Sequence, residues 1–172
     1  GSQIVMGLQT VVSRTLPPRR PGVITVGAFH SGTKHNIISD AAHLQLTVRS
    51  ESAEDRTLLL DGIRRVAENM GRVAGLPDEL LPEVVVSEES VPPTLNDKAL
   101  TERIMGRWNT HFGDGVLFSG ERLGMGAEDF PFFTVDPYIP SLYFAVGGTP
   151  PEDFVREREG GAPVPSHHSP LF

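Results

Sequence analysis

The sequence contains no cysteine, and this absence is the first constraint on its chemistry. Without a thiol the chain has no disulfide, no thiolate nucleophile and no sulfur ligand, so any metal must be held by His, Asp or Glu. The chain also lacks an apolar run of the roughly 20 residues that span a bilayer, and it lacks a basic start followed by an apolar stretch. We therefore expect a cytoplasmic protein with no membrane partner.

Positive charge is scarce as well, with 15 Lys and Arg against 22 Asp and Glu and a formal net charge of −7. Counterion release from phosphates needs clustered positive charge, so nucleic acid is not expected as a partner. The hydrophobic share of 38% still suffices for a buried core, which argues against disorder. A length of 172 residues suits one ordinary domain or two small ones.

Hydrophobic periodicity in the first ninety residues predicts an α+β fold. The expected elements are a helix over 4–12, strands over 22–29 and 40–50, a helix from 52 to about 75, and a strand over 83–87. Ser52 is the expected N-cap of the long helix, because its hydroxyl can accept from a free backbone N–H. These elements predict an antiparallel sheet with two helices on one face, a ferredoxin-like arrangement whose first strand is absent.

The second half of the chain is rich in turns. A stiff connector at 91–94 leads to a helix that runs through Trp108, for which Asn96 is the expected cap. Short apolar segments follow at 116–118 and 141–146, and from Gly147 onward the Gly, Pro and charge content predicts a loop. We expect too few elements here for an independent core.

Several polar residues have both a plain and a functional interpretation. None of the six histidines has a spacing such as HxH or HExxH, so spacing alone predicts no metal site. Neighbouring residues in an extended chain point in opposite directions, so only one of His167 and His168 can be a ligand, and an exposed pair is the plainer interpretation. Glu128 and Asp129 are expected at the start of a short helix. Carboxylates at this position either interact favourably with the positive end of the helix dipole or belong to a functional site.

Three stretches together resemble the M20 family of metallopeptidases and amidohydrolases. VGAFHSGTKHNIISDAA at 26–42, followed by TVR at 47–49, resembles the family's lid-domain signature. MGAEDF at 125–130 resembles the Met-Gly-x-Glu-Asp-Phe motif of the amidohydrolase branch, which includes aminoacylases, hippurate hydrolases and auxin-conjugate hydrolases. HSPLF at 168–172 resembles the late motif with a metal-ligand histidine, and PPTLND at 92–97 resembles the lid exit.

The resemblance implies a hydrolase with two divalent ions per active site, zinc, manganese or cobalt, that cleaves N-acyl amino acids or peptide-like small amides. It implies that His168 is a metal ligand and that Asn36 and Arg49 hold the substrate's carboxylate and carbonyl, often in the partner subunit's site of a homodimer. By default, Asn36 is a turn residue and Arg49 an exposed charge. Glu128 and Asp129 are expected beside the active site.

The resemblance also implies a division of the chain into two incomplete domains. Residues 3–91 correspond to most of the lid or dimerisation domain, and residues 92–172 to a C-terminal part of an α/β, zinc-peptidase-like catalytic domain. The family's early metal motif, its Glu-Glu pair with the general base and its middle metal histidine all precede the lid. We therefore expect no catalytic residue in this chain, and a fragment that is inactive alone and holds metal weakly.

Two other interpretations remain open. A free-standing lid-like dimerisation module has no reason to keep the motifs at 125–130 and 168–172, and a complete module is expected to begin with a strand. An exopeptidase of another M20 branch is disfavoured by the Met-Gly-x-Glu-Asp-Phe motif.

Overall fold

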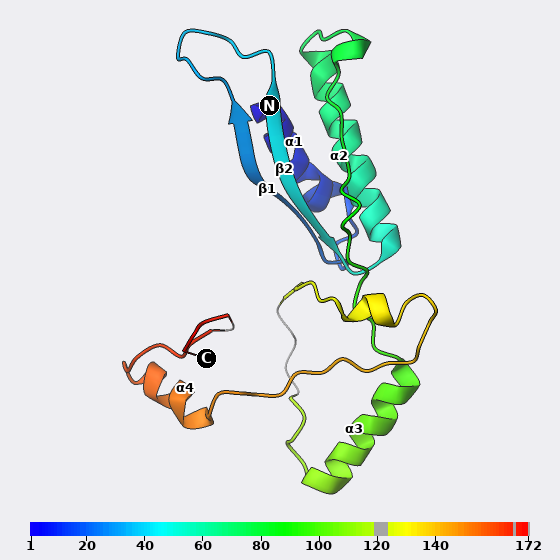
Figure 1. Cartoon of the computed structure of the whole chain (residues 1–172), viewed down its shortest axis with the longest axis vertical. Helices are drawn as coiled ribbons and strands as arrows, with labels where there is room; N and C mark the ends of the chain where they lie inside the picture. The colour runs from blue at the N-terminus through cyan, green and yellow to red at the C-terminus, as the bar shows by residue number, and fades with distance from the viewer. Residues whose placement is uncertain (119–123, 167, 172) are drawn as a thin grey trace.

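The computed structural model of the chain describes residues 1–118, 124–166 and 168–171. It has two parts along its long axis (Figure 1). A β-hairpin with two helices forms the N-terminal layer, residues 1–75. The C-terminal segment, residues 94–171, contains two further α-helices, and residues 76–93 connect the parts.

The hairpin consists of β1 (Gly22–Ser31) and β2 (Ala42–Ser50), which pair as an antiparallel two-stranded sheet. Leu44, Leu46 and Val48 alternate with exposed polar residues, as the sequence pattern predicts. The register shifts between Val26 and Ala28, so β1 carries a one-residue bulge there.

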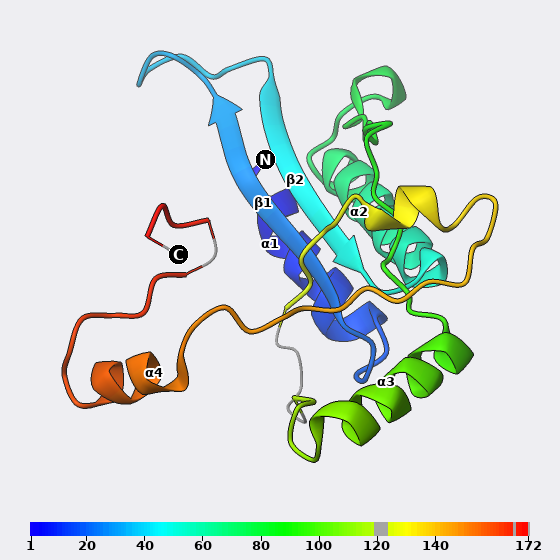
Figure 2. The same ribbon diagram turned by 60° about the horizontal axis from the view of Figure 1, so that its bottom comes forward.

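Both helices of the N-terminal layer cover the same face of this hairpin (Figure 2). The first, α1 (Ser2–Thr10), continues into a π-helical stretch, η1 (Val11–Thr15), and ends before the two prolines. The second, α2 (Ala53–Val73), starts at Ser52, whose Oγ accepts from the Asp55 backbone N–H at 3.0 Å, which confirms the predicted cap. Two helices on one face of an antiparallel sheet is the predicted α+β arrangement.

The core of the molecule lies between the two helices and the sheet. Its buried members come from α1, η1, the turn after them and α2, and they are Leu8, Val11, Leu16, Leu59 and Ile63. Gly62 allows the helices to approach closely, because a Cβ at that position meets the side chain of Val11. The contiguous buried cluster therefore belongs to the N-terminal layer.

One buried charge accompanies this core. The Asp55 carboxylate is 4% exposed and accepts hydrogen bonds from Arg20 Nη1 at 2.8 Å and from Ser52 Oγ at 2.8 Å. The hydrogen bond from Arg20 is the largest of the effects that hold the pKa of Asp55 below its usual value. The ion pair between Arg20 and Asp55 therefore connects the segment before β1 with the start of α2.

Within the described part of the chain, the prediction of a strand over 83–87 is wrong. This stretch is extended and alternates between exposed and half-buried residues, and Val84 packs against the core, but it joins no sheet. A strand needs a hydrogen-bonded neighbour. In a ferredoxin-like sheet that neighbour is the strand before the first helix, which this chain does not contain.

Two helices of the C-terminal segment differ from the sequence predictions. The cap of α3 (Lys98–Phe112) is Asp97, not Asn96, because Asp97 Oδ1 accepts from the Leu100 backbone N–H at 2.8 Å. Residues after Gly147 were expected to be a loop, but they form α4 (Pro151–Arg158). Pro in the first turn, acids near its start and arginines near its end favour this helix.

Packing in the C-terminal segment is sparse, as expected from its few elements. It contains the short 3₁₀ helix η3 (Phe130–Phe133), and the connector contains another, η2 (Asp78–Leu80). Among the described residues after Gly71, only Pro131 is buried. The predicted apolar segments at 116–118 and 141–146 form no strand in the part of the chain that the structure describes.

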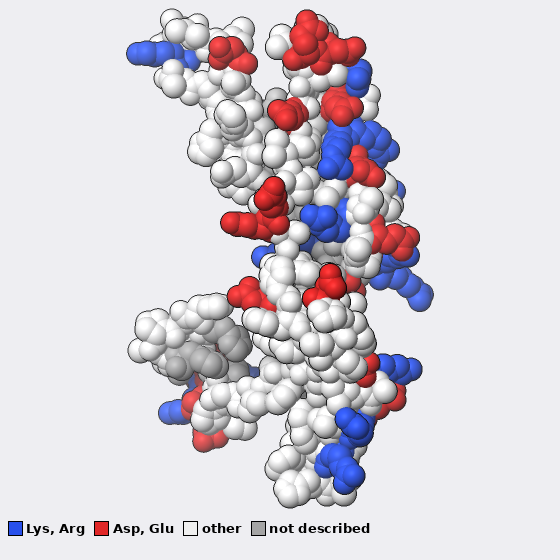
Figure 3. Space-filling view, turned by 45° about the vertical axis from the view of Figure 1, so that its right-hand side comes forward, with Lys and Arg blue, Asp and Glu red and all other residues white. Residues whose placement is uncertain are grey.

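Charges of both signs alternate along the flank of α2 (Figure 3). Arg64 pairs with Asp61 at 3.0 Å, and Arg72 pairs with Glu68 at 3.6 Å. On the face shown, acidic side chains separate the basic ones, so positive charge is not concentrated there. No described helix combines the length and the apolar character that crossing a membrane requires.

Candidate functional site

Arg49 projects from the outer face of the hairpin, opposite the helices. Its neighbours on β2 alternate, so Arg49 shares this face with Gln45 and Thr47. The same face carries Val23 directly across from Arg49 on β1. The strand thus presents a guanidinium group away from the core, near the end of β2 that leads into α2.

The guanidinium of Arg49 meets the Met-Gly motif of the C-terminal segment. Arg49 Nη1 donates a hydrogen bond to the backbone carbonyl of Met125, a residue 76 positions away in the sequence. Arg carries five N–H donors and this contact uses one, so the remaining donors are available for an anionic group. The structure therefore brings together one predicted lid residue and the start of the 125–130 motif.

The same motif is held from its other end by an aromatic contact. The ring of Phe130 lies 5.3 Å from the ring of Tyr143, with the two planes tilted by 44°. Tyr143 is fixed by Asn96, whose Nδ2 donates to the Tyr143 carbonyl at 2.9 Å and whose Oδ1 accepts from the Tyr143 N–H at 2.8 Å. This double contact explains why Asn96 is unavailable as the helix cap.

Asp97 strengthens the same junction through its other carboxylate oxygen. Tyr138 Oη donates to Asp97 Oδ2 at 2.6 Å, and the Asp97 N–H donates to the Ser141 carbonyl at 2.8 Å. The hydrogen bond from Tyr138 is the main reason why the pKa of Asp97 lies below its usual value, and the same bond raises the pKa of Tyr138. Contacts from 96–97 to 138–143 thus fix the start of the C-terminal segment.

Glu128 and Asp129 lie directly before η3, as the sequence predicts. Glu128 is half-buried and Asp129 is exposed. Neither carboxylate forms a hydrogen bond or an ion pair with another described residue, and Asp129 does not cap η3 with its side chain. Both acids therefore lie unpaired among the described residues, close in sequence to the backbone carbonyl that Arg49 contacts, and their place beside an active site stays a prediction.

His168 has a left-handed backbone conformation, with φ at 67°. Such a conformation is uncommon outside glycine. Its neighbour His167 lies outside the described residues. Within the described part of the chain, no group of three His, Cys, Asp or Glu side chains is arranged to hold a metal ion. The described residues therefore do not by themselves fit the two-ion centre that the resemblance implies, and the role of His168 stays a prediction.

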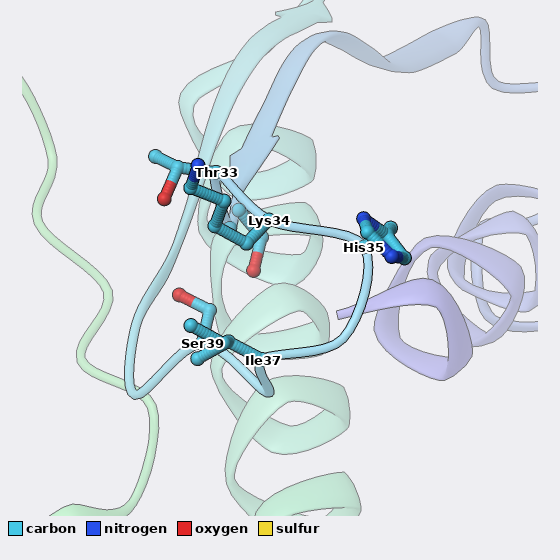
Figure 4. A pocket seen from close by; sticks show the side chains of 7 residues that line it. Thr33, Lys34, His35, Ile37 and Ser39 are labelled. Atoms are coloured by element: carbon cyan, nitrogen blue, oxygen red, sulfur yellow. The ribbon is translucent and has the colours of Figure 1, made fainter.

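Asn36 lies in the loop that joins β1 to β2, and it is exposed. The loop surrounds an open pocket of about 420 Å³, where Thr33, Lys34, Ile37 and Ser39 gather on one side while His35 lies apart (Figure 4). Ser31 Oγ and Ser39 Oγ both donate to the Ala41 carbonyl, at 2.9 and 2.8 Å. These contacts shape a polar loop around Asn36.

Asn36 and Arg49 are not brought together. From Ala42 to Arg49, β2 spans about 24 Å at the usual rise per residue, and the loop with Asn36 continues beyond the Ala42 end (Figure 1). A small substrate cannot contact both side chains of one copy over this distance.

Residues that fix the site were not recognisable from sequence. Asn96, Tyr138 and Tyr143 act through contacts between segments 41 to 47 positions apart, for which the local pattern carries no signal. The Met125 carbonyl is a backbone group, so residue type says nothing about it. Only the pairing of Asn96 and Asp97 after a stiff Pro-Pro stretch hinted at a fixed junction.

Comparison with known proteins identifies a set of relatives, among them three with similar degrees of identity. Thermostable carboxypeptidase 2 of Saccharolobus solfataricus is 30% identical over 97% of this chain and 38% of its own length. N-acetyldiaminopimelate deacetylase of Streptococcus thermophilus is 30% identical over 85% of this chain and 37% of its own length. A Bacillus subtilis protein named as amidohydrolase YhaA is 31% identical over the whole chain and 39% of its own length.

The fold also matches a solved structure. A crystal structure described as an aminohydrolase from methicillin-resistant Staphylococcus aureus aligns with a TM-score of 0.66 and 24% identity, over 80% of this chain and 34% of that one. This likeness supports the lid-type fold. No family model matches the chain. The chain spans less than two fifths of the length of the curated relatives described above.

Proposed function

Because this chain belongs to the M20 family of metallopeptidases and amidohydrolases, we propose that the whole protein hydrolyses the amide bond of N-acyl amino acids or related small amides. The observation that carries the proposal is the contact of Arg49 with the Met125 carbonyl. It places a guanidinium with free donors next to the motif that holds Glu128 and Asp129.

The chemistry of an N-acyl amino acid suits this arrangement. Such a molecule has a free carboxylate next to the scissile amide. Arg forms short, often bidentate hydrogen bonds to carboxylates, and these are roughly twice as strong as those between neutral groups. We assign Arg49 to the substrate carboxylate, and Glu128 and Asp129 to the wall of the site beside it.

Divalent metal dependence is part of the proposal. A bound divalent ion lowers the pKa of its water and polarises the amide carbonyl. The resemblance assigns His168 to this two-ion centre, so we assign the other ligands of the centre to the remainder of the whole protein. The division at 3–91 and 92–172 into lid and catalytic parts is proposed on the same basis.

The test uses the whole protein stripped of metal with a chelator. We expect no release of amine from N-acetyl amino acids until Zn²⁺, Mn²⁺ or Co²⁺ is restored, and no turnover by the 172-residue chain alone with any of these ions. Hydrolysis by the stripped protein, or the absence of hydrolysis across a panel of N-acyl amino acids with metal present, contradicts the proposal.

An exopeptidase activity is the second candidate, because one relative is named as a carboxypeptidase. A carboxypeptidase also needs a positive group for the terminal carboxylate, so Arg49 is compatible with both reactions. Dipeptides with a free amino group separate the two. Faster cleavage of such dipeptides than of N-acetyl amino acids favours the peptidase, and the reverse favours the amidohydrolase.

We also propose that the whole protein is a homodimer through its lid. Two observations support this proposal. Among described residues β1 and β2 pair only with each other, so the sheet has open edges. The separation of Asn36 from Arg49 is explained if Asn36 of one subunit serves the site that contains Arg49 of the other.

Mixing two variants tests this arrangement. Asn36→Ala and Arg49→Met are each expected to be poorly active, but mixed dimers contain one site with both side chains intact. Random exchange of subunits then restores about a quarter of the wild-type activity, as two-fold symmetry requires. No recovery after verified subunit exchange contradicts the shared site, and a monomer in sedimentation contradicts the dimer.

A further inference from the structure

His30 and His43 lie directly opposite each other in the hairpin. The register of β1 and β2 pairs them as cross-strand partners, next to the paired Ser31 and Ala42 at the loop end. Directly opposed residues of an antiparallel pair project from the same face, with Cβ atoms about 4.5–5.5 Å apart. The fold therefore places two imidazoles side by side that are 13 positions apart in the sequence.

The bulge in β1 determines which face carries this pair. Before the shift at Val26, the residues of β1 that face the helices are Ile24 and Val26. After it, Phe29 pairs with Leu44 on the helix side, and His30 joins His43 on the outer face. Without the inserted residue, His30 would face the helices, because side chains alternate along a strand.

The side chains of His30 and His43 take part in no other interaction within the described residues. Both residues are exposed, and within the described chain neither forms a hydrogen bond, an ion pair or a ring contact. Their ring nitrogens are therefore available, and each ring can rotate about its side-chain torsions. Imidazole is a preferred ligand of zinc, copper and nickel, with metal–nitrogen distances of about 2.0–2.1 Å for zinc.

We propose that His30 and His43 chelate one divalent transition-metal ion on the outer face of the hairpin, with water completing the coordination. The site goes beyond the proposed hydrolase function. His43 is six residues from Arg49 along the same strand, which corresponds to about 20 Å, so the ion is remote from the Met125 motif. No third ligating side chain joins the pair among the described residues, so binding is weaker than at a structural zinc centre.

Titration of the purified 172-residue chain with NiCl₂ in a calorimeter tests the proposal. We expect one ion per chain. Chelation raises affinity by making the second contact intramolecular, so His30→Gln and His43→Gln should each weaken binding by about 100-fold, and the double variant should abolish it. His35→Gln is the matched control and should leave the affinity unchanged.

Paramagnetic broadening gives a readout that does not depend on a variant. Substoichiometric Ni²⁺ should broaden the ring C–H signals of His30 and His43 together, before those of the other histidines. Unchanged affinity in a double variant with wild-type circular dichroism overturns the proposal. So does broadening centred on His35 or His168, or a stoichiometry of one ion per two chains, which assigns the metal to a contact between copies.

Discussion

The N-terminal layer and the C-terminal segment are held together by different forces. The first buries Leu8, Val11 and Leu59 almost completely between two helices and a hairpin. The second has helices of its own but buries only Pro131 among its described residues, and it depends on hydrogen bonds such as those of Asn96 and Asp97. Burial of apolar area drives cooperative folding, whereas exposed polar contacts contribute little net stability.

This difference bears on function because the proposed site lies where the two parts meet. Arg49 belongs to the well-packed layer, and Met125 belongs to the sparsely packed segment. The layer holds the guanidinium in place, while the segment brings the motif with Glu128 and Asp129 to it. Segments of low packing density are also those that move most readily on ligand binding.

The sharpest test of the comparison is a pair of truncations in the two parts. Leu59→Ala removes a fully buried side chain and should lower the free energy of unfolding by about 2–5 kcal/mol. Ile104→Ala in α3 removes a half-buried side chain and should cost about 1 kcal/mol or less. Urea unfolding followed by circular dichroism measures both, and equal losses would show that the C-terminal segment shares the core's cooperativity.

Helix caps offer a smaller effect of the same kind. Ser52→Ala removes the cap of α2 and should lower the free energy of global unfolding by about 1 kcal/mol. Asp97→Ala removes the cap of α3, and because that helix lies outside the core, it should reduce helicity without moving the main unfolding midpoint. The contrary result is a main transition that shifts as much for Asp97→Ala as for Ser52→Ala.

A fall in pH should weaken the two parts of the molecule by protonating different carboxylates, Asp55 in the N-terminal layer and Asp97 in the C-terminal segment. The pKa of Asp55 is lowered in the folded state, so its stabilising effect is present above the unfolded pKa of about 3.9 and is lost as pH falls through the folded value. Asp55→Asn should therefore flatten the loss of global stability as pH falls below about 4. A pH profile of thermal midpoints for wild type and variant checks this, and parallel profiles would contradict it.

The pKa of Asp97 is shifted in the same direction as that of Asp55, but its effect is expected near α3 and not in the global stability. Its pKa is also lowered, so protonation below about pH 4 should weaken the hydrogen bond from Tyr138. Tyr138 fluorescence should change in that range while the circular dichroism of the N-terminal layer holds. Tyr138→Phe serves as the control, because it removes the hydroxyl and should abolish the change.

Patterns within a few residues allowed much of the N-terminal layer to be predicted from sequence. Alternation along β2 identified its polar face, and Ser52 was recognisable as the cap of α2. The strand expected over 83–87 has the right alternation but no partner. Helix α4 was missed because proline and glycine around Pro151 outweighed a favourable order of charges.

The candidate site depended more on long-range contacts than on local patterns. Asn36, Arg49 and the 125–130 motif were singled out by resemblance, but spacing did not show that Arg49 reaches the Met125 carbonyl. The pairing of His30 with His43 was invisible for the same reason. It depends on strand register and on one inserted residue in β1, which the sequence pattern does not reveal.

The measurement that tests the central claim most directly compares two substrates in the whole protein. One is an N-acetyl amino acid and the other is its carboxamide, which lacks the negative charge. If Arg49 binds the substrate carboxylate, Arg49→Met should lower kcat/KM for the acid by about 10- to 100-fold, the range for a lost charged hydrogen bond. The carboxamide should lose far less, and the control Arg64→Met should change neither. Equal losses for both substrates would contradict the account.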